Sequence, residues 1–189
     1  MSDTGDWRTR RWETTHQRIY DVALALFQEH GFEQVSVGQI SSAAGVSVPT
    51  FYAHYPSKEH LIMQLPTAED IAALISTQPP DLPVGERIRQ AVALYFAQWD
   101  MPAQLARWRI IATTPALRRR AAEFERATAE LVAGALPSGP GTSASATDAI
   151  MINAYLAAFT TGVLAWADGN GERKIQALVD EAFDTLERH

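Results

Sequence analysis

The side chains best suited to acid–base or metal chemistry in this 189-residue chain are five histidines, and their positions form no catalytic pattern. They are His16, His30, His54, His60 and His189. The sequence contains no Gly-x-Ser-x-Gly nucleophile motif, no phosphate-binding glycine loop and no His-Glu-x-x-His zinc motif. It also lacks cysteine, which excludes disulfide bonds, zinc–thiolate sites and thiol catalysis. We therefore expect no catalytic residue, no metal and no cofactor.

A denser group of polar, aromatic and basic side chains lies in the first third of the chain. Ser36 and Ser47 each precede a short apolar-periodic stretch, and serine is a favourable helix N-cap residue. Gly45 lies between the two stretches, where a helix must break. This spacing predicts short helices over 36–44 and 48–55. With a helix before them, they have the arrangement of a helix-turn-helix that reads DNA.

The side chains of these two short helices divide into an inward and an outward set. The inward set is apolar and would pack against the preceding helix: Val37, Ile40, Val46 and Phe51. The outward set can reach base edges, thymine methyl groups and phosphates in a major groove. It comprises Val48, Pro49, Thr50, Tyr52 and His54, with Ser36, Gln39 and Lys58 at its edges.

The elements that must position these side chains are helices throughout. A helix over 14–30, terminated by Gly31, carries apolar residues at helical spacing. The rest of the chain lacks strand-type alternation, so we expect an all-α protein of about nine helices. The further helices are predicted over 57–77, 84–100, 102–113, 115–136, 147–168 and 172–188. Pro66 should kink or split the first of these, and it either takes part in signalling or is simply tolerated.

The run from residue 14 to residue 62 resembles the TetR family of transcriptional repressors in residue type and spacing. The matching residues are Gly31-Phe32, Ser36-Val37, Gln39-Ile40, Ala44-Gly45-Val46-Ser47, Phe51-Tyr52, His54-Tyr55, Ser57-Lys58 and Leu61. The resemblance implies a homodimer that binds a palindromic operator and is released by a small molecule. It implies an N-terminal arm and DNA-binding domain over 1–62 and a helical-bundle ligand and dimerisation domain over 63–189.

The resemblance also assigns DNA contacts to individual positions. These are Ser36, Gln39, Ser47, Val48, Pro49, Thr50, Tyr52, His54, Tyr55 and Lys58. Lys58, at the start of a helix, suits a phosphate contact. Packing is the alternative role for Tyr52 and above all for Tyr55, and plain exposure is the alternative for His54.

The C-terminal region is similar, over 107–118, to the effector domain of mycofactocin and acyl-CoA-type members of the family. This similarity favours a small hydrophobic or acyl-type effector. By analogy, we expect ligand contacts from aromatic side chains on several helices, although ordinary core packing is the alternative role for each. The candidates are Phe96, Trp99, Trp108, Phe124 and Tyr155.

The last two predicted helices are broadly apolar. The stripe on the first comprises Ile152, Leu156, Phe159, Val163 and Leu164, and that on the second comprises Ile175, Leu178, Val179, Ala182, Phe183 and Leu186. In the resembled family the last two helices pair with those of a second subunit, so we expect these stripes to form the dimer contact. The dimer would hold two recognition helices about 34–36 Å apart, the spacing of successive major grooves.

The formal net charge of −6 runs against DNA binding, because affinity for phosphates comes from lysine and arginine. Arg8, Arg10 and Arg11 form a short basic arm that would either contact DNA or remain a solvated tail. The acidic balance leaves open a helical binding or scaffold module that keeps the fold without DNA binding. The N-terminus is polar and we find no apolar run long enough to span a bilayer, so we expect no membrane contact and a cytoplasmic protein.

Overall fold

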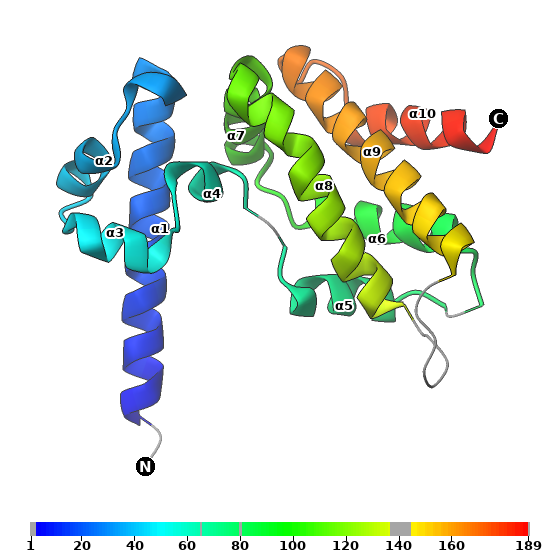
Figure 1. The fold of residues 1–189 in the computed structure, drawn as a ribbon, viewed down its shortest axis with the longest axis horizontal. Helices are drawn as coiled ribbons and strands as arrows, with labels where there is room; N and C mark the ends of the chain where they lie inside the picture. The colour runs from blue at the N-terminus through cyan, green and yellow to red at the C-terminus, as the bar shows by residue number, and fades with distance from the viewer. Residues whose placement is uncertain (1–2, 65, 80, 137–144, 189) are drawn as a thin grey trace. The chain divides into compact units, whose positions relative to one another are not determined.

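The computed structural model describes residues 3–64, 66–79, 81–136 and 145–188, and these residues form helices, turns and loops without a strand (Figure 1). The all-α class expected from the sequence is confirmed. The chain divides into two compact units, Met1–Gln64 and Leu65–His189. Each unit has its own buried apolar core.

The first unit supports two very short helices on one long one. Its elements are α1 (Asp3–His30), the 3-10 turn η1 (Phe32–Gln34), α2 (Val37–Ala43), α3 (Val48–His54) and α4 (Lys58–Ile62). α1 ends where Gly31 adopts a φ of 83°, which residues with a Cβ rarely adopt. Ile19, Ile40 and Phe51 are fully buried in the core of this unit. Each such side chain contributes roughly 1.5–3 kcal/mol through its burial.

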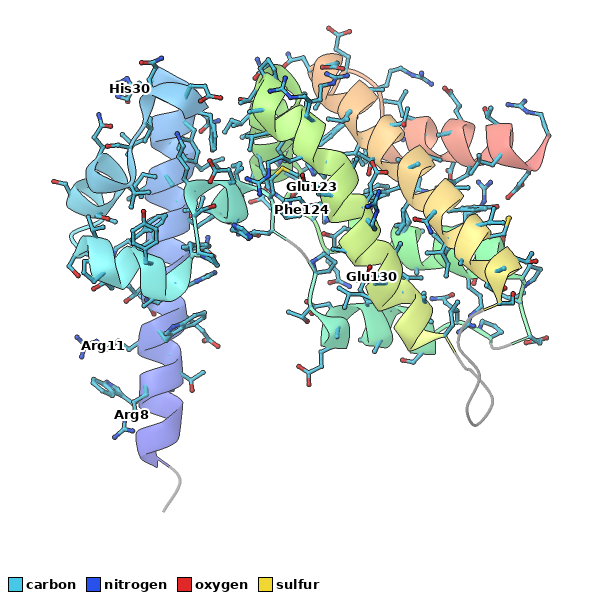
Figure 2. The ribbon with its side chains drawn as sticks, viewed as in Figure 1. Arg8, Arg11, His30, Glu123, Phe124 and Glu130 are labelled. Atoms are coloured by element: carbon cyan, nitrogen blue, oxygen red, sulfur yellow. The ribbon has the colours of Figure 1, made fainter. Side chains whose placement is uncertain are left out.

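The prediction of a short basic arm before the first helix is wrong, because α1 begins at Asp3 rather than near Thr14. Arg8, Arg10 and Arg11 therefore lie within the helix, and all three are exposed. Figure 2 shows Arg8 and Arg11 extending from its N-terminal part. No proline or glycine interrupts residues 6–30, so nothing in the local sequence stops the helix from extending towards the N-terminus.

The second unit is a bundle built around α9. Its helices are α5 (Ala68–Ser76), α6 (Val84–Ala97), α7 (Met101–Thr113), α8 (Pro115–Ala135), α9 (Ala146–Asp168) and α10 (Ile175–Glu187). α9 contacts α6, α7, α8 and α10, and it supplies Ile152 and Val163, both without exposed surface. Proline in the first turn of α7 and α8 starts each helix where its missing N–H has little effect.

The helix predicted over 57–77 is split into α4 and α5, which raises the number of α-helices from the expected nine to ten among the described residues. α4 ends at Ile62, and α5 starts from a capping box in which Thr67 and Asp70 satisfy each other's backbone N–H groups. Pro66 immediately precedes this cap, and proline disfavours helical backbone in the residue before it. The predicted break at Pro66 is confirmed, and it is a split rather than a kink.

α9 has the length and apolar composition needed to cross a membrane, contrary to the expectation that no segment of the chain would. About 44% of the apolar 18-residue stretch of this helix is buried inside the fold. Core helices of soluble proteins meet the same two criteria, so this feature is weak evidence for a membrane span.

Much of the apolar stripe expected to join two subunits lies in the core of a single chain instead. Ile152, Val163, Val179 and Phe183 have no exposed surface. The large apolar side chains that α9 and α10 leave exposed are Ile150, Met151 and Leu186, with exposed fractions of 69%, 36% and 37%. The stripes close the monomer because α9 and α10 pack on each other and on α6.

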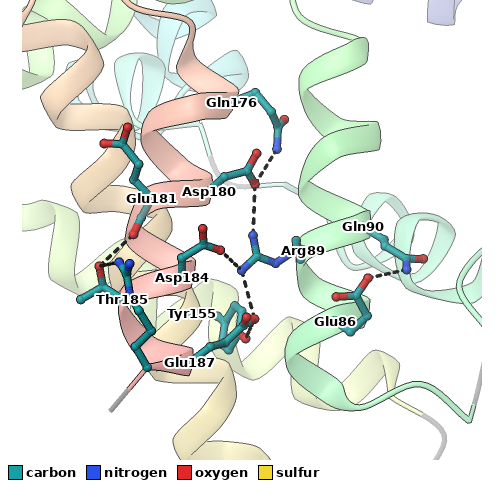
Figure 3. A network of polar contacts seen from close by, with 11 residues as sticks. Glu86, Arg89, Gln90, Tyr155, Gln176, Asp180, Glu181, Asp184, Thr185 and Glu187 are labelled. Carbon is teal, nitrogen blue, oxygen red and sulfur yellow. Dashed lines mark hydrogen bonds and ion pairs between the residues drawn. The ribbon is translucent and has the colours of Figure 1, made fainter.

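A polar network ties α10 to α6 and α9 (Figure 3). The Arg89 guanidinium lies 3.4 Å from Asp180, 2.8 Å from Asp184 and 3.0 Å from Glu187. The Tyr155 hydroxyl donates to Glu187 over 2.8 Å. Burial, together with this hydrogen bond, raises the pKa of Tyr155 to about 12. The last helix is thus held by charge as well as by apolar packing.

We predict that Gly162→Ala destabilises the second unit. A Cβ at Gly162 would lie 2.8 Å from Val179 Cγ2 and 2.9 Å from Val179 Cα, so α9 and α10 would have to separate. We expect the free energy of unfolding in urea to fall by about 1–3 kcal/mol, which exceeds the gain of about 1 kcal/mol from helix propensity. Gly134→Ala is the matched control, because a Cβ there meets open space on α8. An increase in stability in both variants would contradict the close approach.

Candidate nucleic-acid interface

The turn between α2 and α3 sets the direction of both helices. Gly45 has a φ of 64°, and the backbone N–H of Val46 returns to the carbonyl of Ser41 at 2.9 Å. Ser36 begins α2 through a capping box with Gln39, and the Ser47 hydroxyl accepts from the backbone N–H of Thr50. These two predicted N-caps are confirmed.

α3 buries one side and exposes the other. Phe51 has no exposed surface, whereas Val48 is 40% and Tyr52 is 53% exposed. Ser47 and Pro49 are exposed as well, and Thr50 is half-buried with its hydroxyl 2.7 Å from that of Ser47. The Tyr52 ring meets the Phe51 ring edge-on, with their centroids 5.5 Å apart. A short row of apolar and hydroxyl groups therefore faces away from the core.

The first turn of α2 adds two exposed polar side chains beside this row. The Ser36 hydroxyl and backbone N–H both donate to Gln39 Oε1 over 2.8 Å. Because the capping box uses only the amide oxygen, the Gln39 amide nitrogen can still donate to a phosphate or a base. Gln39 is therefore better placed than Ser36 to contact a nucleic acid.

Lys58 has a structural role that the sequence did not indicate. Its ammonium group donates to the carbonyls of Phe32 over 2.8 Å and Val35 over 3.0 Å, and it lies 4.3 Å from the centre of the Phe32 ring. These contacts hold the loop between α1 and α2 onto the start of α4. Two of the three ammonium protons are thus committed within the protein, which leaves one for the phosphate contact that the sequence suggested.

Tyr55 and His54 face α1 rather than solvent. Tyr55 is 3% exposed, and its hydroxyl donates to the carbonyl of His16 over 3.1 Å. It is therefore a core residue, and its assignment as a DNA contact does not fit the structure. His54 is half-buried, and its ring lies 4.9 Å from that of Trp12. The packing role named as the alternative for Tyr55 is confirmed, and His54 packs in part, because the last turn of α3 rests on α1.

Four rings connect the N-terminal part of α1 to the end of α3, and we call this group the α1–α3 ring stack. Its members are Trp12, His16, His54 and Tyr55, and the Trp12–His16 and His16–Tyr55 centroids are 4.7 Å and 4.2 Å apart. The sequence did not indicate a packing role for Trp12 or His16. Their spacing of one helical turn was the available signal, but the expected helix began only after Trp12.

Burial lowers the pKa of His16, and the neighbouring His54 lowers it further. Burial lowers the pKa of His54 as well. The Nδ1 atoms of both rings are buried and have no hydrogen-bond partner among the described residues. The α1–α3 ring stack is therefore suited to neutral imidazoles.

The five aromatic residues expected to line a ligand pocket have different surroundings. Phe96 and Trp99 contact each other with centroids 4.9 Å apart, and both pack in or against the main core of the second unit with Trp108. Tyr155 packs on Phe183 and uses its hydroxyl in the Arg89 network. Phe124 is half-buried on α8. Within the described ranges no group of three or more His, Cys, Asp or Glu side chains could hold a metal ion.

Comparison with known proteins places the first unit in a regulatory family. Residues 19–65 match the family model described as bacterial regulatory proteins, tetR family. Over 142 residues the chain is 30% identical to the HTH-type transcriptional regulator TcmR of Streptomyces glaucescens, a match that covers 67% of this chain and 62% of that protein. Over 49 residues it is 49% identical to MftR of Mycobacterium tuberculosis, which is named for regulation of mycofactocin biosynthesis, covering 26% and 25%. The matches thus span less than two thirds of either relative.

Solved structures share the fold along most of the chain. NalD, the secondary repressor of the MexAB-OprM multidrug efflux pump of Pseudomonas aeruginosa, has a TM-score of 0.58 at 22% identity, with 93% of this chain and 96% of that chain covered. Thermus thermophilus FadR, a repressor crystallised with lauroyl-CoA, has a TM-score of 0.51 at 21% identity, with 91% and 93% covered.

The structure and the comparisons point to the same family. The supporting observations are the exposed row on α3, the glycine turn before it, the family match over residues 19–65 and the shared fold of both units. The relatives are transcriptional regulators rather than enzymes. The chain belongs to the TetR family of bacterial transcriptional regulators.

Proposed function

We propose that this regulator is a repressor that binds a palindromic operator as a homodimer and is released by a small hydrophobic or acyl-type effector. The observation that carries the proposal is the outward face of α3. Val48 and Tyr52 are apolar or aromatic and substantially exposed on a helix whose inward side chain, Phe51, has no exposed surface. Such side chains suit contact with thymine methyl groups and base edges in a major groove.

Within this interface we assign base or sugar contacts to Val48, Pro49, Thr50 and Tyr52 and backbone contacts to Ser47, Gln39 and Ser36. His54 reaches the interface only through its exposed edge, because the α1–α3 ring stack holds the rest of its ring. The exposed Arg8, Arg10 and Arg11 supply positive charge to the unit despite the net charge of −6. The local position of these cations matters more to phosphates than the total charge does.

For the second unit we propose an effector site lined by Phe96, Trp99, Trp108 and Phe124, whereas Tyr155 is a core residue whose hydroxyl serves the Arg89 network. The crystallised lauroyl-CoA complex of FadR supports an acyl-type effector. An effector releases the operator if it binds the conformer that does not bind DNA more tightly, and operator binding then weakens effector binding by the same factor.

The homodimer would form through the parts of α9 and α10 that the monomer leaves uncovered. Ile150, Met151 and Leu186 are the large apolar side chains exposed there. An exposed apolar group of this kind suits a two-fold contact in which the same surface meets itself.

A scaffold module that keeps the fold without binding DNA is the alternative, and the acidic net charge favours it. A gel shift with the DNA upstream of the chain's own gene separates the two functions. Binding that is saturable and specific at low salt supports the repressor, whereas its absence under these conditions supports the scaffold.

Tyr52→Ala should weaken operator binding by about tenfold or more, because a good base contact contributes about 1–3 kcal/mol. Tyr52 is 53% exposed, so the free energy of unfolding should change by less than about 0.5 kcal/mol. Fluorescence anisotropy with a labelled operator at fixed salt measures the affinity. Leu94→Ala, at an exposed apolar position of the second unit, is the control. Undiminished binding by Tyr52→Ala would place the DNA contact elsewhere.

Lys58→Met separates the structural role of Lys58 from a phosphate contact. The variant leaves two carbonyls without their donor, so we expect the free energy of unfolding to fall by about 1–3 kcal/mol. The slope of the logarithm of operator affinity against the logarithm of salt concentration should be the same as for the unchanged chain. A slope reduced by about one charge, with stability intact, would instead show that Lys58 serves the DNA.

Stability of the first unit should fall as the pH decreases from about 7.5 to about 5.5. The folded state lowers the pKa of His16 and His54, so the unfolded chain binds more protons in this range and acid favours unfolding. His16→Phe keeps a ring in the α1–α3 ring stack without a titrating group. The urea midpoint of unfolding should therefore change less with pH in this variant than in the unchanged chain. His30→Gln, at the exposed end of α1, is the control. An unchanged slope in His16→Phe would show that His16 does not contribute to the pH dependence.

A further inference from the structure

Two arginines on α6 lie two residues apart and have opposite environments. The side chain of Arg89 is 20% exposed and faces the three carboxylates of α10. Arg87 is only 4% exposed, and no carboxylate pairs with it in the part of the chain that the structure describes. Its Nη2 atom donates to the carbonyl of Ile75 over 3.4 Å, and its Nε atom is buried without a partner.

A buried guanidinium without an anion is energetically unfavourable. Arginine does not lose its proton in proteins, so burial does not neutralise it. The effective penalty for burying an unpaired ion is several kcal/mol, which is why buried charges are normally paired. The Ile75 carbonyl lies at the C-terminal end of α5, where the helix dipole offsets part of the charge. One long hydrogen bond to a neutral acceptor still leaves most of the donor capacity of Arg87 unused.

The residue whose carbonyl Arg87 contacts and the residue that follows it on α6 are both core residues, and the other unsatisfied groups of this unit are also donors. Ile75, whose carbonyl Arg87 contacts, and Ile88, the next residue along α6, both belong to the main core. The indole nitrogens of Trp99 and Trp108 are buried without hydrogen-bond partners. Among the described residues of the second unit, the buried side-chain atoms that lack a partner are therefore all N–H donors, and none is an acceptor.

We propose that Arg87 is the anchor for an anionic head group on an otherwise apolar ligand of the second unit. A carboxylate or phosphate accepts two parallel hydrogen bonds from the arginine fork and supplies the missing counter-charge. An apolar body suits the core to which Ile75 and Ile88 belong. That this ligand is the effector of a repressor rests on the proposed function, whereas the anion site itself rests on Arg87 alone.

Binding of decanoate and of decan-1-ol to the full chain, without DNA, tests this site. The two probes share the apolar body and differ in the charge of the head group. Isothermal titration should show at least about tenfold tighter binding of decanoate to the unchanged protein. Arg87→Gln should abolish this preference and leave decan-1-ol binding unchanged. Arg119→Gln, at an exposed position on α8, should keep the preference. Decyl phosphate distinguishes a phosphate head group from a carboxylate by which of the two binds more tightly.

Equal binding of decanoate and decan-1-ol to the unchanged protein, including binding of neither, overturns the anion site. Retention of the preference in Arg87→Gln overturns it as well. If Arg87→Gln shows no cooperative thermal transition, Arg87→Lys replaces it, and the retained charge should keep the preference for decanoate; loss of the preference in this folded variant overturns the proposal. Because these measurements contain no operator, a chain that failed to bind DNA would still give a decisive result for the site.

Discussion

The outward face of α3 depends on the burial of its inward face. A helix of seven residues is too short to be stable alone in water, so α3 exists because tertiary contacts hold it. Phe51 places the middle of the helix in the core, Tyr55 attaches its end to α1, and Ser47 satisfies its first turn. The same contacts decide that Tyr52 and Val48 point to solvent. A loss of packing at Phe51 would therefore remove the outward face of α3 together with the fold.

The polar contacts of the first unit are used mostly for positioning. Lys58 secures the loop before α2, and the α1–α3 ring stack secures the end of α3 with rings rather than with an ion pair. Because Lys58 is used within the protein, a phosphate contact would depend more on the exposed arginines of α1, which are Arg8, Arg10 and Arg11. Their place in a rigid helix also means that any phosphate contact they make has a defined geometry, with less entropy lost than a flexible arm would lose.

The second unit satisfies its charges unevenly. Arg89 pairs with three carboxylates of α10, and together with Tyr155 it fixes α10 to the bundle. Arg87, two residues earlier on α6, contacts a carbonyl of α5 and has no carboxylate partner among the described residues. A fold that supplies three acids to one arginine could have supplied one to its neighbour, so the unpaired site is consistent with a ligand that completes it.

Local sequence was sufficient for most of the helices, because each carries its own period, cap or breaker: Ser36, Ser47, Gly45 and Pro66 all act where they were expected. It did not locate the start of α1, which lies at Asp3 rather than near Thr14. The family likewise followed from residue types at fixed spacing between 31 and 61. The roles of Tyr55, Lys58 and the apolar stripes of α9 and α10 did not, because an apolar or amphipathic side chain suits a core and an interface equally well. Only the packed chain decided which partner each of them meets, since burial and pairing are set by residues distant in sequence.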